Sequence, residues 1–173
     1  MELARSPMHR SPLLSIALVA GLAAGFAAPA TAQRLLAPDQ LSGGLIELDP
    51  VDGAVLNLGA VDLVALTGGA AILPVAAAEG PNGESWVSDI LADTVFRLDR
   101  TATVYLGSIP AALDSPRQLV RNAGGMLLAN AGFENGAPGP SLVQLDVHGV
   151  LVTSYPATEP FGLLPFERAG VEG

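Results

Sequence analysis

The apolar and polar positions of this chain repeat in short segments rather than in long helical stretches. Three five-residue segments share the order apolar, apolar, polar, Leu, Asp, and they lie at 45–49, 95–99 and 142–146. Their final aspartates are 50 and 47 residues apart. Short apolar runs bounded by turn residues predict β-strands, and their return at a near-constant period indicates a repeat architecture.

Each of these segments is predicted to belong to a unit of four short strands. A second β-rich stretch follows each segment, and a further strand precedes two of them. These additional strands lie at 54–58, 103–106, 150–155, 85–89 and 126–130. A leading strand begins at Pro74 and again at Pro116, and a third copy begins at Pro160. Four short strands in about 40–50 residues is the spacing of a β-propeller blade.

The residues between the strands favour tight turns. Residues 49–53 (DPVDG) and 146–149 (DVHG) occupy equivalent places in the repeat, and Gly there supplies a positive φ for a hairpin. The recurring aspartates at 49, 99 and 146 are interpreted in the same way, as turn residues. The Ala-rich stretch at 60–78 has room for a helical turn, but its Gly and Pro residues argue against a long helix.

Two segments resemble blades of the NHL type. One runs from Pro116-Arg-Gln-Leu-Val through Gly-Gly-Met-Leu-Leu-Ala-Asn130 to Ser-Leu-Val-Gln-Leu-Asp146, and the other from Gly83-Glu-Ser-Trp-Val-Ser-Asp89 to Asp-Thr-Val-Phe-Arg-Leu-Asp99. The superfamily includes six-bladed propellers similar to gluconolactonase, the senescence-marker proteins and virginiamycin lyase. The resemblance implies an all-β fold of β-propeller-like repeats, each a four-stranded antiparallel blade.

The number of predicted blades is about three, which is too few for a closed ring. Closed propellers have about four to eight blades, so the ring is expected to be incomplete. Two explanations are open: the chain is a truncated copy of a longer propeller, or chains associate through the open blade edges. An unpaired strand edge invites pairing with another chain. The blade count favours truncation.

The first 32 residues have the three zones of a secretory signal peptide. Arg5 and Arg10 give a positive start, residues 13–28 are almost wholly apolar, and Ala30-Thr31-Ala32 suits signal peptidase. The apolar run is shorter than the roughly 20 residues of a spanning helix. We therefore expect cleavage before Gln33, a periplasmic or secreted protein, and no membrane association after cleavage.

The remaining residues, 33–173, are predicted to form one partial propeller domain with an acidic surface. They carry six Arg, no Lys and sixteen carboxylates, a formal charge of −10. Such a charge argues against nucleic acid and against anionic membranes as partners. The chain has no Cys, which excludes disulfides and thiolate metal sites.

Few side chains suggest catalysis, and no catalytic residue is predicted. His148 is the only histidine after residue 32, and its place in a hairpin predicts an exposed turn residue. A zinc site would need clustered His or Cys. Trp86 is expected in the core, and so are Phe161 and Phe166.

Asp89 and Asn130 are the candidate metal ligands, because they end the same strand in successive repeats. In gluconolactonase-like relatives, carboxylate and amide side chains near the central channel hold a divalent ion, and oxygen ligands suit calcium or magnesium. The resemblance thus implies a divalent-cation site here. The alternative is that each side chain caps its own following turn.

Taken together, these features favour an exported binding or scaffold module rather than an enzyme. Its binding surface is expected on blade loops such as 131–140, and its partner would be a small molecule or a protein. The alternative is a metal-dependent propeller enzyme, a lactone hydrolase or lyase by resemblance.

Overall fold

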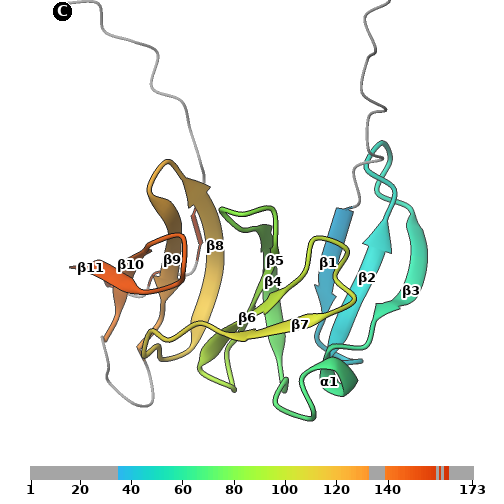
Figure 1. Cartoon of the computed structure of the whole chain (residues 1–173), viewed down its shortest axis with the longest axis horizontal. Coiled ribbons are helices and arrows are strands. Elements are labelled where there is room, and N and C mark those ends of the chain that lie inside the picture. The colour runs from blue at the N-terminus through green and yellow to red at the C-terminus, as the bar shows by residue number, and fades with distance from the viewer. Residues whose placement is uncertain (1–34, 133–138, 159, 161, 164–173) are drawn as a thin grey trace, which may run out of the picture. The chain divides into compact units, whose positions relative to one another are not determined.

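The computed structural model describes residues 35–132, 139–158, 160 and 162–163. In this part of the chain, eleven strands form three antiparallel sheets, joined by turns and one short helix (Figure 1). The strands are β1 (Leu35–Asp39), β2 (Gly44–Leu48), β3 (Val55–Val61), β4 (Pro74–Glu79), β5 (Ser85–Asp89), β6 (Thr94–Leu98), β7 (Tyr105–Ser108), β8 (Pro116–Asn122), β9 (Gly125–Asn130), β10 (Ser141–Leu145) and β11 (Leu151–Pro156), and the helix is α1 (Leu63–Leu66). The all-β prediction is confirmed.

Each sheet is a meander in which neighbours in the sequence are neighbours in space. The strand orders are β1-β2-β3, β4-β5-β6-β7 and β8-β9-β10-β11. The predicted strand 85–89 is β5 without a shift, whereas β2, β6 and β10 each begin one residue before the predicted start. The blade-like sheet architecture expected from the repeat is therefore present. Residues 33–173 form one compact unit, and the predicted signal peptide lies outside the described residues.

The predicted hairpins are confirmed at both DPVDG and DVHG. Gly53 has φ +76° and its N–H donates to the Asp49 carbonyl at 2.9 Å, and Gly149 has φ +82° with the same bond to Asp146 at 3.1 Å. The Ala-rich stretch holds only α1, as its composition predicts. Asp62 caps this helix by accepting the Ala65 N–H at 2.9 Å.

Two apolar cores lie between neighbouring sheets. Side chains of β5 alternate between the two faces of its sheet and so contribute to both cores. Trp86 packs with Leu128 and Val143 of the third sheet, while the next residue, Val87, packs with Leu45 of the first sheet. Successive side chains of a strand point to opposite faces. The middle sheet is thus covered on both faces, which explains why Trp86 and Val87 are fully buried.

The first strand of each four-stranded sheet lies beside the sheet that precedes it in the chain. β4 contacts β8, and β1 contacts β4 (Figure 1). The register shows, however, that β1 is not a first strand. Its last residue, Asp39, pairs with Gly44 at the start of the next strand, as Asp89 pairs with Thr94 and Asn130 with Ser141. β1 is therefore the counterpart of β5 and β9, and it is not among the strands that the repeat pattern predicts.

Candidate functional site

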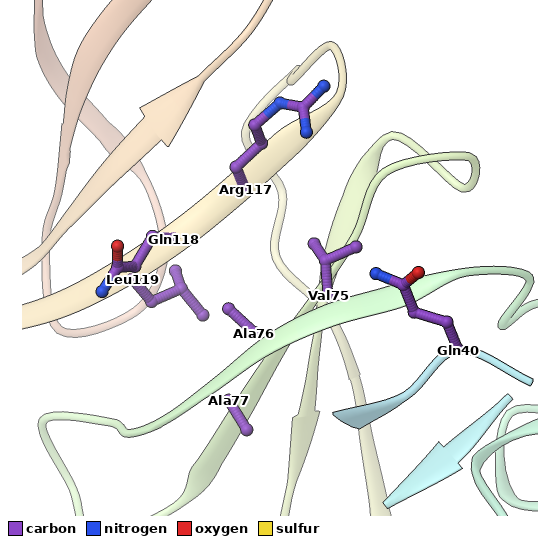
Figure 2. Close-up of a pocket in the computed structure, with 7 residues that line it drawn as sticks. All are labelled: Gln40, Val75, Ala76, Ala77, Arg117, Gln118 and Leu119. Carbon is purple, nitrogen blue, oxygen red and sulfur yellow. The ribbon is translucent and has the colours of Figure 1, made fainter. Parts of the chain in front are cut away.

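A hollow of about 400 Å³ lies between the first strands of the second and third sheets (Figure 2). Residues 75–77 of β4 and 117–119 of β8 form its walls, and Gln40, directly after β1, reaches it from the first sheet. The β4 wall consists of Val and two Ala, whose small side chains leave the space between the strands open. Segments from all three sheets therefore meet at this one place.

The polar groups of the hollow are one guanidinium and two carboxamides. Arg117, Gln118 and Gln40 contribute them, and Figure 2 shows Arg117 and Gln118 on the same strand and Gln40 beside Val75. The Gln118 Oε1 accepts the backbone N–H of Leu163 at 2.8 Å. The Ser88 hydroxyl donates to the backbone carbonyl of Arg117, which ties β8 to the middle sheet. A guanidinium beside amides offers directed donors to an anionic or hydroxylated ligand.

Asp89, the first of the predicted metal ligands, is buried and accepts four backbone N–H groups. One carboxylate oxygen accepts from Ile72 and Leu73 at 2.7 and 2.8 Å, just before β4. The other accepts from Leu91 and Ala92 at 3.1 and 2.9 Å, in the turn after β5. The turn-capping bonds that the alternative expects are thus present, and the side chain also binds the entry of its own sheet.

Asn130, the second predicted ligand, has the same place in the third sheet and a related set of bonds. Its Oδ1 accepts the Asp114 N–H at 2.9 Å, two residues before β8 begins, and its Nδ2 donates to the Gly139 carbonyl at 2.9 Å. No group of three or more His, Asp or Glu side chains that could hold a metal ion occurs among residues whose placement is described. A divalent-cation site at Asp89 and Asn130 stays a prediction.

The three recurring aspartates at 49, 99 and 146, which directly follow β2, β6 and β10, close their hairpins. Asp146 accepts from His148 and Val150 at 2.8 and 2.9 Å, and these backbone bonds, that from Val150 above all, lower its pKa. In Asp99 the hydroxyl of Thr101 is the largest cause that lowers the pKa to about 2, followed by the N–H of Val104. Asp49 accepts the Val51 N–H at 2.7 Å. Turn closure therefore accounts for their recurrence.

Some of the remaining predictions from the sequence are confirmed, and others concern residues that the structure does not describe. Trp86 is in the core and His148 is exposed in its turn, as expected. Phe161, Phe166 and most of the loop at 131–140 lie outside the described residues. No helix in the described ranges is long and apolar enough to cross a bilayer.

Sequence reasoning did not find the hollow. Its residues follow the leading prolines: Val75 and Ala76 after Pro74, and Arg117 and Gln118 after Pro116. Aligning these leading strands would have shown that small apolar residues in one repeat stand where long polar ones stand in the next. The contact between the two strands, some 40 residues apart, is visible only in the fold.

No protein-family model and no curated protein matches the chain. A solved structure, a crystal structure of a protein of unknown function from Bacteroides caccae, is similar with a TM-score of 0.50 and 20% sequence identity. The likeness covers 75% of this chain and 47% of that chain, so this chain spans about half of the length of its structural relative. At this identity the likeness concerns the fold alone.

Proposed function

We propose that this protein is an exported β-propeller-type binding module that takes a small carboxylate-bearing molecule in the hollow between β4 and β8. The observation that carries the proposal is the hollow itself, where one guanidinium and two carboxamides surround a wall of small apolar side chains. Ligand sites commonly combine an apolar wall with a few polar groups, in volumes of about 300–1,000 Å³.

The propeller part of the proposal is supported by the arrangement of the three sheets. β1 contacts β4, and its counterpart β5 contacts β8, so the same contact with the following first strand repeats from sheet to sheet. The first strands β4 and β8 also contact each other. In a propeller such strands surround the central channel, where ligands are accessible. Export is supported by the pattern of residues 1–32.

The ligand class follows from charge and donor geometry. Arg117 presents a planar set of N–H donors that matches a carboxylate, and Gln40 and Gln118 can each donate or accept. The chain as a whole carries a charge of −9, so long-range attraction of an anion is not expected. Selectivity must then arise from direct hydrogen bonds inside the hollow.

The test compares succinate with butane-1,4-diol, which has the same carbon chain without charge. Titrated into ¹⁵N-labelled residues 33–173, succinate should move the side-chain amide signals of Gln40 and Gln118, and the diol should not. Arg117→Gln should remove the shifts. The matched control is Arg121→Gln, on the same strand, because Arg121 is exposed and pairs with Glu79 at 3.4 Å outside the hollow. Equal shifts in both variants, or none at about 10 mM succinate, would contradict the proposal.

A further inference from the structure

Among the described residues, the first sheet has three strands, and none of them pairs with β1 on the side opposite β2. Its strands correspond to the second, third and fourth strands of the other sheets, because Asp39 matches Asp89 and Asn130 in register. Burial agrees with this. The corresponding strands β5 and β9, which have neighbours on both sides, are almost wholly buried, whereas every residue of β1 is half-buried or exposed.

The side chain at the end of β1 lacks the donors that its counterparts have. Asp89 accepts from Ile72 and Leu73, and Asn130 from Asp114, in each case from the residues just before the first strand of the same sheet. The described residues that donate to Asp39 are Leu41 and Ser42, both in its own turn. Asp39 is therefore placed to accept one or two further N–H groups from an incoming strand.

The chain itself carries a segment of the required kind. Pro160 begins a third copy of the leading strand that starts at Pro74 and Pro116. The described part of this segment lies beside β8, where the Leu163 N–H donates to Gln118. β8 lies against β4, and β4 against β1, so this copy of the segment is at a different sheet from the open edge.

We propose that a second copy of this chain supplies the missing strand. The segment beginning at Pro160 in each copy pairs antiparallel with β1 of the other copy, so that one two-fold axis satisfies both edges. Two copies then contain six four-stranded sheets. One copy of this chain matches 47% of the solved structure from Bacteroides caccae, so that chain is about twice as long as the part that this chain matches.

The two complete sheets predict the register of this pairing, and they agree. Pro74 lies opposite Asp89 and Pro116 opposite Asn130, which places Pro160 opposite Asp39. The pairs Ala77–Val87 and Leu119–Leu128 each place Leu163 opposite Ala37 of the other copy. The residue equivalent to Ile72 and Asp114 is Thr158, whose N–H would donate to Asp39 of the other copy.

Engineered cysteines test the register, because the natural chain has none. In residues 33–173, which form one compact unit, the double variant Ala37→Cys/Leu163→Cys should form a disulfide-linked dimer on mild oxidation. The matched control is Pro38→Cys/Leu163→Cys, since a shift of one residue turns the side chain to the other face. Equal linkage in both variants, a disulfide within one chain, or no linkage would each overturn the proposal.

A second test measures the dissociation constant of the dimer by sedimentation over a range of concentrations. It compares unmodified residues 33–173 with variants of Asp39. Residues 33–173 should sediment as a dimer. Asp39→Ala should raise the dissociation constant about a hundredfold, because the two-fold dimer loses one hydrogen bond to a charged group at each of its two edges, and each such bond is worth about tenfold. Asp39→Asn should keep the dimer, because Asn130 fills the same place in the third sheet. A monomer at all concentrations, or equal effects of Ala and Asn, would overturn the proposal. Neither test depends on whether succinate binds.

Discussion

Replacing Asp89 by Ala separates the structural role of this side chain from a role in metal binding. The carboxylate is fully buried and accepts N–H groups from two segments of chain, the entry to β4 and the turn after β5. A hydrogen bond to a charged acceptor contributes about 1.5–3 kcal/mol, and a buried donor left without a partner costs a similar amount. The substitution should therefore affect the free energy of unfolding strongly.

The magnitude follows from which donors water can reach after the substitution. Ile72 and Leu91 are both exposed, and their N–H groups can bond to water, so most of the loss comes from the half-buried donors of Leu73 and Ala92. The loss of two such bonds is partly offset, because the variant no longer has to bury a charge. The expected loss in the free energy of unfolding is about 3 kcal/mol. Asp89→Asn should lose about 2 kcal/mol, because the amide oxygen can keep the bonds to one segment while the amide nitrogen faces the N–H donors of the other.

The assay is unfolding of residues 33–173 by guanidinium chloride, followed by circular dichroism, once in EDTA and once in excess calcium. The control is Asp52→Ala, which removes one exposed bond to the Ala54 N–H and should cost less than about 0.5 kcal/mol. The structural reasoning predicts the same loss for Asp89→Ala in both solutions. A loss below about 1 kcal/mol would refute it, and a loss seen only with calcium would instead support the metal site.

Three further changes test the turns and the core. Gly125→Ala should lower the free energy of unfolding by at least about 2 kcal/mol in the same assay, because φ is +141° and a Cβ would lie 2.1 Å from the Leu145 carbonyl oxygen; a neutral effect would contradict the hairpin geometry. Trp86→Phe should cost about 2 kcal/mol in thermal melts, since the indole is buried and donates to Glu84 at 3.1 Å. Asp99 has a folded pKa of about 2 against an ordinary 3.8, so its contribution is present above pH 3.8 and is lost as the pH falls to about 2. Asp99→Asn should reduce the change of the melting temperature with pH between those two values. If the melting temperature changes with pH as much as in the unmodified protein, Asp99 does not have this role.

The strands and turns were predictable because each repeat places its apolar run directly before a turn-closing aspartate. In the middle sheet, for example, the Asp99 N–H donates to the Val104 carbonyl at 2.9 Å while its side chain accepts from Thr103 and Val104. Such bonds connect residues within five positions, so the local sequence contains all the information that they need. The hairpins at Gly53 and Gly149 were predictable for the same reason.

The hollow and the first strand were not predictable in this way. Arg117 and Val75 meet only because two sheets pack side by side, and nothing in either repeat alone places them together. β1 was missed because Pro38 disfavours a strand; Pro occurs in sheets mainly at edges. The 50-residue spacing from Asp39 to Asp89 could have indicated it. A proline that removes one backbone donor is most easily accommodated in a strand that has an open side.

The position shared by Asp39, Asp89 and Asn130 explains why recurrence in a repeat does not by itself distinguish a turn residue from a ligand. At 49, 99 and 146 the aspartate binds only its own hairpin, whereas Asp89 and Asn130 also bind the chain that enters the first strand of their sheet. These two are polar and buried because they join segments some 16 residues apart. The same requirement applies to Asp39, where the described chain provides only the turn. What the repeat preserves at this position is an acceptor for the chain that enters the first strand of a sheet.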